Sequence, residues 1–351
     1  MSTPALVLGG TGYVAGELLR LIAGHPELEL AAAISDSQPG ERIAKSFGHL
    51  AAVYPQTTFA SIGSASMIFT ETRRAALFSA APHGAAAALI DRLLTSAAAA
   101  KCDLRVVDIS ADFRYSNADA YQKIYGHPHG APQRLKEFTC AVPEHLPKLA
   151  TAHVAHPGCF ATAALLASVP LLALDIAEPQ IFISAVTGST GSGRKPTEGT
   201  HHPTRHSDLY AYNALNHRHT PEIRACAKAA SGVDADFAFV PHSGPFARGI
   251  HATVQATAKR PVTTEALLAM LRDFYLDQPF VRVLDQPPRM KDIVASNYAH
   301  VSAVASGGTI AVMSVVDNLN KGAAGGAMQW MNRMLGFEET AGLTAPAAGW
   351  T

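Results

Sequence analysis

The sequence is poor in cysteine and has no long uninterrupted hydrophobic run. Its four cysteines, at positions 102, 140, 159 and 226 of 351 residues, form no CxxC pair and no dense framework. Such spacing is typical of a reduced, cytosolic protein rather than a disulfide-stabilised secreted one. No apolar run has the length that a membrane-crossing helix needs, and the first residues lack a basic region followed by an apolar signal core. We therefore expect a soluble, cytoplasmic protein that does not bind a membrane.

The chain also lacks an excess of either charge. Lys plus Arg and Asp plus Glu number 28 each, so the formal net charge is zero. This balance gives no support for a nucleic-acid partner. Hydrophobic residues make up 48% of the chain, which is typical of a well-packed globular protein. The length exceeds that of one ordinary domain, so two domains are expected.

A glycine-rich turn follows the first predicted strand. Residues 5–8 are apolar, residues 17–22 have a helical pattern, and Gly10, Gly12 and Ala15 between them fit the form GxGxxA. Small residues let backbone N–H groups approach a pyrophosphate at the helix N-terminus, as in dinucleotide-binding folds. The predicted cofactor contacts in this turn are Gly10, Thr11, Gly12, Tyr13 and Val14.

The end of the second predicted strand, at residues 29–34, is where the adenosine ribose would be recognised. Asp36 would suit the free hydroxyls of NAD, whereas Arg42 and the serines Ser35 and Ser37 would suit the extra phosphate of NADP. The pattern leaves both cofactors open.

Further strands are predicted at residues 75–80 and 104–109, the first of them followed by an alanine-rich helix. This alternation indicates an α/β fold with a mostly parallel sheet. Short-chain dehydrogenases and sugar epimerases share such a beginning but use a Tyr-x-x-x-Lys pair. None of the nine tyrosines here is followed by Lys four residues later, which argues against those enzymes.

The segment around Cys159 is the strongest candidate for a catalytic centre. Pro157 and Gly158 predict a sharp turn, and the helix-favouring residues after Cys159 place it at or just before a helix start. The helix dipole there favours a thiolate, and unpaired N–H groups could hold an oxyanion. The alternative is an inert, buried cysteine. Pro170 predicts a kink or an early stop in this helix, which otherwise ends near Leu174.

A flexible loop at residues 187–195 follows a predicted strand at 181–186 and ends in two cations. It is either a linker or a loop that offers N–H groups and cations to a phosphate or cofactor. Beyond it, five histidines lie between residues 201 and 219. They lack HExxH and a nearby cysteine pair, so we expect no metal site. His217 and His219 precede a predicted helix, where one of them could act as general acid/base beside Cys159.

Taken together, these motifs resemble those of N-acetyl-γ-glutamyl-phosphate reductases, in the aspartate-semialdehyde-dehydrogenase-like group. The resemblance rests on ordered segments along nearly the whole chain: residues 9–16, 108–114, 156–159, the loop to Lys195, 217–223, 241–242 with 248–249, and 317–325. It implies a Rossmann-type dinucleotide-binding domain formed by residues 1–157 plus 318–351. It also implies an inserted α+β catalytic and oligomerisation domain at residues 158–317.

The resemblance further implies NADP(H) as cofactor, a role in arginine biosynthesis and a homo-oligomer, either dimer or tetramer. The Cys159 thiolate would attack the acyl phosphate of N-acetylglutamate, and hydride transfer to the resulting thioester would give the semialdehyde. His219 would be the general acid/base, with His217 the next candidate. The expected substrate contacts are Arg114, Ser110, Arg248, His217 and Lys195. Ser192, Gly193 and Asn318 are expected near the nicotinamide.

The sequence departs from the family pattern at three positions. Asp36 stands where an Arg-like residue is common, so the NADP preference stays open. His156 and Ala161 stand where Asn and Pro are common, which would retune the surroundings of the thiol. The alternatives are a reductase of a related acyl phosphate, of the aspartyl or aminoadipyl type, and a nucleotide-binding protein without catalysis.

Overall fold

The computed structural model describes residues 2–349, which form two compact units. The first contains the chain up to Ala141, Lys148–His156 and Ala324–Thr344; the second contains Val142–Pro147, Pro157–Ala323 and the residues from Ala345 onward. The domain boundaries expected from the sequence, near residues 157 and 318, stay a prediction. No helix within residues 2–349 is long and apolar enough to cross a membrane.

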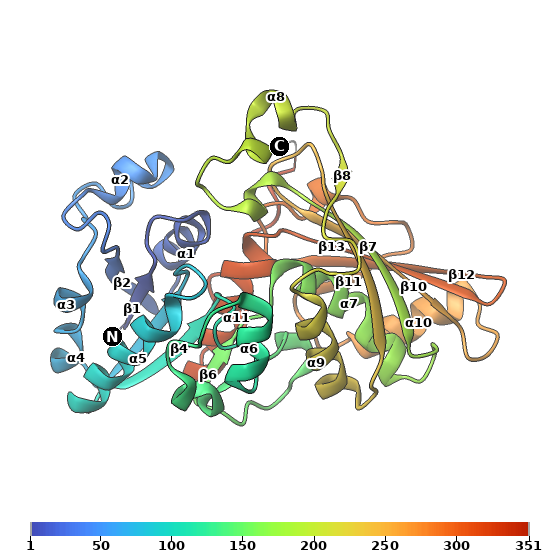
Figure 1. Ribbon diagram of the computed structural model, residues 1–351, viewed down its shortest axis with the longest axis horizontal. Helices are drawn as coiled ribbons and strands as arrows, with labels where there is room; N and C mark the ends of the chain where they lie inside the picture. Colours follow the sequence, from blue (N-terminus) through green and yellow to red (C-terminus); the bar gives the residue numbers. More distant parts are fainter. Residues whose placement is uncertain (1, 350–351) are drawn as a thin grey trace. The chain divides into compact units, whose positions relative to one another are not determined.

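The first unit is built on a six-stranded sheet whose paired strands all run parallel, in the order β2-β1-β3-β4-β6-β5 (Figure 1). Its strands are β1 (Thr3–Leu8), β2 (Leu28–Ile34), β3 (Arg74–Ser79), β4 (Asp103–Asp108), β5 (Phe138–Cys140) and β6 (His153–Ala155). Its helices are α1 (Tyr13–Ala23), α2 (Ile43–Ser46), α3 (Ile62–Ala65), α4 (Ile68–Glu71), α5 (Ala86–Ala99), α6 (Ala118–Tyr125) and α11 (Gly325–Leu335). The four strands predicted before residue 110 are confirmed as β1 to β4.

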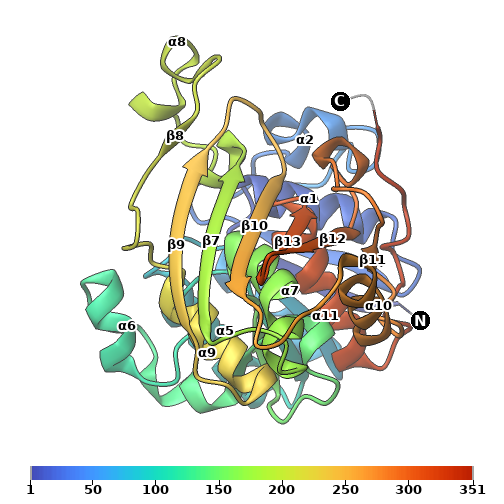
Figure 2. The same ribbon diagram turned by 90° about the vertical axis from the view of Figure 1, so that its right-hand side faces the viewer.

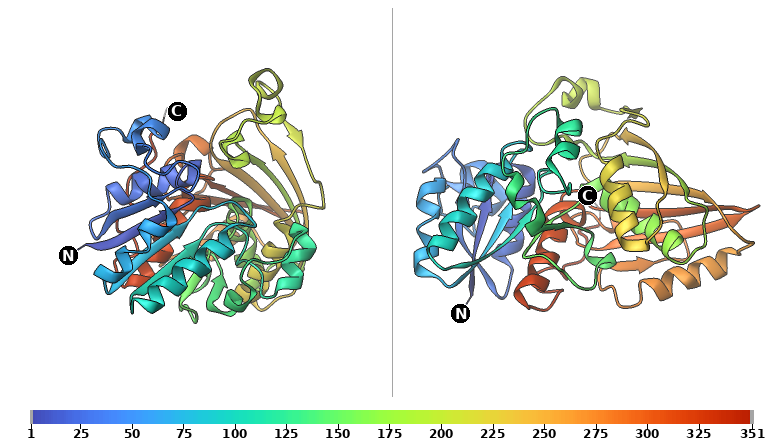
Figure 3. Two further views of the ribbon diagram at one scale, coloured as in Figure 1. Left: turned by 60° about the vertical axis from the view of Figure 1, so that its left-hand side comes forward. Right: turned by 60° about the horizontal axis from the view of Figure 1, so that its bottom comes forward.

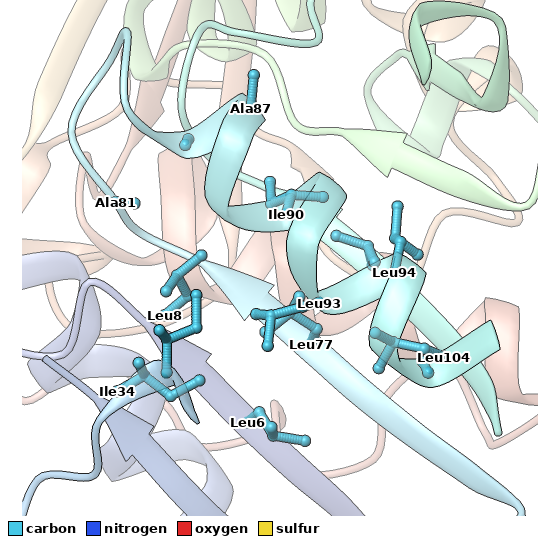
Figure 4. Packing of buried hydrophobic residues seen from close by; sticks show 14 of the residues in the cluster. Leu6, Leu8, Ile34, Leu77, Ala81, Ala87, Ile90, Leu93, Leu94 and Leu104 are labelled. Atoms are coloured by element: carbon cyan, nitrogen blue, oxygen red, sulfur yellow. The ribbon is translucent and has the colours of Figure 1, made fainter. Parts of the chain in front are cut away.

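Both faces of this parallel sheet are covered. Leu6, Leu8 and Leu77 pack against Ile90 and Leu93 of α5 (Figure 4), and all are at most 2% exposed. Because side chains alternate along a strand, the intervening residues of β1 point to the other face, where α1 and α11 pack. This arrangement brings the glycine turn to the carboxyl end of β1.

The second unit is built on a mixed seven-stranded sheet in the order β11-β12-β13-β10-β7-β9-β8. Its strands are β7 (Gln180–Thr187), β8 (Tyr210–Ala211), β9 (Asp236–Ser243), β10 (Ile250–Thr257), β11 (Val281–Val283), β12 (Ala299–Ser306) and β13 (Thr309–Val316). Its helices are α7 (Cys159–Ala173), α8 (His202–Arg205), α9 (Thr220–Ser231) and α10 (Thr264–Phe274). Helices α7, α9 and α10 cover one face of the sheet, and α7 and α9 are seen behind β9, β7 and β10 in Figure 2.

The other face of this sheet carries side chains that remain partly exposed. Residues of β7 alternate between exposed and buried, because only one face packs on the helices. Phe182 of β7 and Val304 of β12 lie on the open face and are 52% and 45% exposed. The segment that carries α8 extends away from the sheet (Figure 3).

Helix α7 is apolar on all sides and is buried along almost its whole length. It runs through Pro170 and ends at Ala173, so the predicted end near Leu174 is confirmed. Of the two alternatives expected at Pro170, a kink or an early stop, the early stop is wrong. A proline has no N–H, so the carbonyl of Leu166, four residues earlier, loses its usual helical partner. The hydroxyl of Tyr275 donates to that carbonyl at 2.7 Å and replaces the missing bond.

Candidate active site

The glycine turn of the first unit brings the backbone close to neighbouring strands. Gly9 has a φ of +80°, and a Cβ built on it would lie 2.6 Å from the Ala80 backbone. A Cβ on Gly10 would lie 3.1 Å from the Ile34 carbonyl oxygen, which accepts the Gly10 N–H at 2.8 Å. Larger residues would therefore push the turn away from the sheet.

Gly12 differs from these two glycines because a Cβ on it would meet no atom of residues 2–349 within 4 Å. It is the N-cap of α1 and has extended backbone angles, and a glycine has no side chain with which to cap the helix. The start of α1 is therefore open on the side where a side chain of residue 12 would stand. This geometry fits a dinucleotide pyrophosphate, which helix N-terminal N–H groups and the dipole bind.

The four residues proposed for ribose recognition follow the carboxyl end of β2, and they differ in the bonds that they make. Asp36 is exposed, and its Oδ1 accepts the Ile62 N–H at 3.2 Å, at the start of α3. The Ser35 and Ser37 hydroxyls lie 3.2 Å apart. Arg42 is exposed at the start of α2, and its guanidinium makes no ion pair within residues 2–349. Asp36 thus supports a helix, while the cation remains available to an anion.

Residues 108–114 form a tightly bonded turn after β4. The Ser110 hydroxyl donates to Asp108 Oδ2 at 2.6 Å, and Asp108 is fully buried. Burial raises the pKa of Asp108 to about 6, with the Ser110 bond opposing this rise and the nearby Asp112 charge adding to it. Arg114 donates from Nε to the His156 carbonyl at 3.0 Å and from Nη2 to the Ile109 carbonyl at 2.8 Å. The turn therefore anchors Arg114, which is 7% exposed, to His156, three residues before Cys159.

Cys159 is the first residue of α7 in the second unit and is partly buried. Gly158 is the N-cap, and its N–H donates to Glu222 Oε1 of α9 at 2.8 Å. Gly322 lies against the cysteine, since a Cβ built on it would be 2.8 Å from Cys159 Cβ. The predicted position at a helix start is thus found, with the dipole favouring a thiolate.

His217 and His219 are each 7% exposed, and the ring of Phe160 lies near both, at 5.8 Å and 6.5 Å between centroids. Burial and, to a smaller extent, the neighbouring Arg218 charge lower the pKa of His217 to about 4. His217 is therefore uncharged at neutral pH. Its Nδ1 accepts the His219 backbone N–H at 3.2 Å, so the single ring proton is on Nε2. His217 presents a donor rather than a base.

Arg248 and Asn318 belong to one bonded cluster in the second unit. Nε and Nη2 of Arg248 each lie 3.0 Å from a carboxylate oxygen of the fully buried Asp317. Asn318 accepts the Gly249 N–H at 2.8 Å and donates to Thr190 Oγ1 at 3.0 Å. Asn318 therefore ties the 188–193 loop to the start of β10.

The remaining loop candidates are solvent-exposed. Ser192, Gly193 and Lys195 lie on the surface of the second unit. His201, His202 and His206 are exposed on the segment that carries α8. Within residues 2–349, no group of three or more His, Cys, Asp or Glu side chains is arranged to hold a metal ion.

Three residues with evident roles around Cys159 were missed by sequence reasoning. Tyr212 lies near enough that burial and the Cys159 charge both raise its pKa, and its ring is 5.7 Å from that of His217. Glu222 lies in the first turn of α9, and its carboxylate holds the N-cap of α7. Glu144, which pairs with Lys321, carries no local signal in the sequence.

Comparisons with known proteins agree with this description. A family model described as semialdehyde dehydrogenase, NAD binding domain, matches residues 5–155, and one described as semialdehyde dehydrogenase, dimerisation domain, matches residues 159–318. The structure of aspartate semialdehyde dehydrogenase II complexed with ASA from Vibrio cholerae covers 95% of this chain and 98% of its own. Its TM-score is 0.70 at 14% identity, which confirms the predicted α/β fold.

The relatives found by sequence are closer. The N-acetyl-gamma-glutamyl-phosphate reductase of Methanopyrus kandleri is 38% identical over 97% of this chain and 97% of its own length. That of Ectopseudomonas mendocina is 36% identical over 97% of this chain and 98% of its own length. Identity of this extent over the full length shows that the chain belongs to the N-acetyl-gamma-glutamyl-phosphate reductase family.

Proposed function

We propose that the protein reduces N-acetyl-γ-glutamyl phosphate to N-acetylglutamate 5-semialdehyde and phosphate with NADPH, a step of arginine biosynthesis. The observation that carries the proposal is Cys159 at the first position of α7, followed by Phe160 packed against two buried histidines. Family membership gives the substrate, because full-length relatives bear this name. Aspartyl and aminoadipyl phosphates are the less favoured substrates.

Cys159 is the nucleophile of the first step. The N-terminus of α7 favours its thiolate, which attacks the acyl carbonyl of the substrate. A sulfur–carbon bond forms, the bond from the carbonyl carbon to the phosphate oxygen breaks, and inorganic phosphate leaves. His219 takes the thiol proton, since His217 already presents Nε2–H and has a pKa of about 4. His217 donates to a substrate oxygen.

The second step releases the aldehyde. Bound NADPH supplies the hydride that reduces the thioester carbonyl. The carbon–sulfur bond then breaks, and His219 returns its proton to the sulfur of Cys159. The N–H groups at the start of α7 stabilise negative charge on the substrate oxygen in both steps.

The substrate's anionic groups bind to three cations: Arg114, Arg248 and Lys195. Arg248 is oriented by its bidentate pair with Asp317 and is not a free side chain that must be ordered on binding. Ser110 contributes by holding the turn that carries Arg114, because its hydroxyl is bonded to Asp108. Ser192, Gly193 and Asn318 line the position of the nicotinamide.

NADPH rather than NADH is the proposed reductant. Thr11, Tyr13 and Val14, with Gly10 and Gly12, form the pyrophosphate site. Ser35, Ser37 and the exposed Arg42 would bind the 2′-phosphate. The Asp36 carboxylate, which would favour NAD, is already bonded to the Ile62 N–H.

The assembly proposed for this chain is a homo-oligomer, in its simplest form a dimer. The support is the match of residues 159–318 to a dimerisation-domain model, together with the partly apolar open face that carries Phe182 and Val304. A cytoplasmic location is proposed from its four free cysteines. Sedimentation velocity of the purified protein would distinguish monomer, dimer and tetramer.

The decisive experiment measures phosphate-dependent oxidation of N-acetylglutamate semialdehyde with NADP⁺. Cys159→Ser should abolish turnover while NADPH binding, followed by fluorescence, stays at the wild-type value. Cys226→Ala, which changes another free cysteine, should keep most of the activity and serves as the control. Turnover retained by Cys159→Ser would contradict the mechanism. Faster turnover of aspartate semialdehyde by the wild type would favour the aspartyl alternative.

A further inference from the structure

A π-helical turn lies directly behind the proposed nucleophile. The turn Asn320–Ala324 precedes α11, and π turns of this kind are rare and often found at functional sites. A Cβ on its Gly322 would lie 2.8 Å from Cys159 Cβ and 3.1 Å from Cys159 Cα. The backbone of the turn therefore forms a wall against the first residue of α7. A small shift of the turn would move Cys159 or open a gap behind it.

The turn is held by a buried ion pair. Lys321, the residue before Gly322, pairs through Nζ with Oε1 of Glu144, and both side chains are 0% exposed. The ammonium also lies 5.6 Å from the centre of the Phe280 ring. Asn320 adds a bond from Nδ2 to the Ala295 carbonyl at 3.0 Å. The two residues before Gly322 are thus each held by a different partner, Lys321 by Glu144 and Asn320 by Ala295.

The partner of Lys321 belongs to a short 3-10 turn, Pro143–His145, that also supports α7. His145 Nε2 lies 3.0 Å from the Tyr275 hydroxyl, whose only proton is directed to the Leu166 carbonyl of α7. His145 therefore donates from Nε2. Burial lowers the pKa of His145 to about 4, which keeps this ring neutral, with the second nitrogen unprotonated. The same turn consequently supports α7 at two places: at the Leu166 carbonyl through His145 and Tyr275, and at its start through Glu144 and Lys321.

Stability alone gives a weak reason for this ion pair. Moving two charges out of water costs several kcal/mol for each ion, and well-packed apolar replacements of buried pairs are often neutral or stabilising. A charged pair is, however, directional, and it fixes one position of the lysine backbone where apolar packing tolerates several. Because Lys321 is next to Gly322, a fixed lysine backbone also fixes the backbone that contacts Cys159.

We propose that Lys321 and Glu144 are positioning residues for Cys159, acting through the contact of Gly322 with the start of α7. The proposal rests on the proposed role of Cys159 as nucleophile. The pair sets the position of the sulfur relative to the N–H groups of α7, and so sets both its thiolate character and its line of attack. Neither residue contacts the substrate or the cofactor in this proposal.

The test replaces both charges at once, so that no unpaired ion remains buried. In Glu144→Leu/Lys321→Met we expect an unchanged or higher melting temperature. We expect kcat to fall about tenfold to a hundredfold, as for a nucleophile misplaced by a fraction of an ångström to 1 Å. The KM for N-acetylglutamate semialdehyde and the Kd for NADPH should stay at wild-type values. The pH profile of Cys159 alkylation by iodoacetamide, read by mass spectrometry, should move to higher pH.

A second variant leaves the ion pair intact and tests the contact itself. Gly322→Ala adds the methyl group that meets Cys159, so it should lower kcat and move the alkylation profile as well. Lys259→Met is the matched control, because it breaks the exposed pair with Asp175 in the same unit and should change neither quantity. If the double variant fails to fold, Gly322→Ala still decides the contact, and wild-type kcat with a wild-type profile in it would overturn the proposal.

The outcomes separate this inference from the proposed function. Wild-type kcat and alkylation profile in a folded Glu144→Leu/Lys321→Met protein would overturn the positioning role and leave the mechanism standing. Turnover by Cys159→Ser would instead contradict the role of Cys159 as nucleophile, and so the proposed function, independently of the result for the ion pair. A lower kcat with an unshifted alkylation profile would also count against the inference, because the sulfur would then be correctly placed.

Discussion

The two units hold their reactive positions by different physical means. In the first unit, Gly9 and Gly10 let the backbone approach the sheet, and Gly12 leaves open space at the start of α1. In the second unit, buried charged side chains surround the start of α7: Glu222 on the N-cap, and Glu144 with Lys321 behind it. The glycine turn thus depends on the absence of side chains, whereas the start of α7 depends on buried ionic side chains.

This difference determines how each site fails. A glycine turn fails by steric obstruction, so the added Cβ matters more than its chemistry. A site built from buried carboxylates fails when a hydrogen-bond partner or a counter-charge is removed, which costs more than the bond itself contributed. Substitutions in the second unit should therefore have the larger effects, and mainly on kcat.

The largest effect is expected from Glu222→Ala. It leaves the buried Gly158 N–H without its acceptor and loosens the start of α7. We expect kcat to fall about 100-fold, a misplacement effect, while the Kd for NADPH is unchanged because the glycine turn is untouched. Stopped-flow kinetics and fluorescence titration would measure the two quantities.

Glu222→Gln is the matched control, because its amide oxygen can still accept the Gly158 N–H. It should retain most of the activity. Equal losses in Glu222→Ala and Glu222→Gln would mean that the charge of Glu222, rather than its hydrogen bond, matters. A rise in the Kd for NADPH would contradict the expectation that substitutions at the start of α7 leave cofactor binding at the glycine turn unchanged.

The next effect concerns the carbonyl left unpaired by Pro170. Tyr275→Phe removes the hydroxyl that donates to Leu166 and should lower the free energy of unfolding by about 2 kcal/mol, the usual cost of a buried unsatisfied group. In a Pro170→Ala background, residue 170 regains an N–H for the same carbonyl, so the cost of Tyr275→Phe should shrink. A double-mutant cycle by urea denaturation would measure this coupling. Additive losses would contradict the explanation of how α7 tolerates its proline.

The same contrast explains how much could be read from the sequence. The glycines of the turn lie within eight consecutive residues, between a predicted strand and a predicted helix. The local pattern alone therefore predicted the turn. Cys159 was also predicted, because Pro157, Gly158 and the helix-favouring residues are its sequence neighbours. Glu144 and Lys321 are 177 positions apart and meet only when the second sheet and its helices have packed. No local pattern distinguishes such carboxylates and lysines from ordinary surface residues.

A similar reason explains why the fold was predicted only in part. Strands β1, β2 and β3 contain continuous apolar runs, as a parallel sheet buried on both faces requires, and β4 has such a run interrupted only by Arg105. The three-residue strands β5 and β6 are too short to show a pattern. The helix continues past Pro170, where a kink or an early stop was expected, because a distant tyrosine supplies the missing bond. The sequence around the proline does not show this tyrosine.

A smaller effect should distinguish two neighbouring glycines of the first unit. Gly12→Ala adds a methyl group where no described atom lies within 4 Å, so the melting temperature should not change. The methyl occupies the proposed pyrophosphate site, and the Kd for NADPH should rise about tenfold, or 1.4 kcal/mol. Gly10→Ala presses on Ile34 and Phe59 and should lower the melting temperature as well. An unchanged NADPH affinity in Gly12→Ala would contradict the assignment of this turn to the cofactor.

The smallest effect is a difference in acid sensitivity between the units. Burial lowers the pKa of His145 and of His217 in the second unit to about 4. Their unfolded forms bind protons near pH 6.5, so stability is present above that pH and is lost as the pH falls toward 4. In the first unit, burial also lowers the pKa of His153 to about 4, but it raises that of Asp108 to about 6. Asp108 has the opposite sign, because its folded form holds a proton that the unfolded form has lost.

From pH 7 to pH 6 we therefore expect the second unit to lose about 1 kcal/mol and the first unit less than half of that. His25 and His129 in the first unit and His251 and His300 in the second also have pKa values lowered by burial, and they act in the same direction in both units. Hydrogen exchange followed by mass spectrometry at both pH values would compare α7 and α9 with α5. His145→Gln should reduce the loss in α7 and α9 because its side chain does not titrate. Equal losses in the two units, or an earlier loss in α5, would show that buried ionisable groups do not set the acid stability of the second unit.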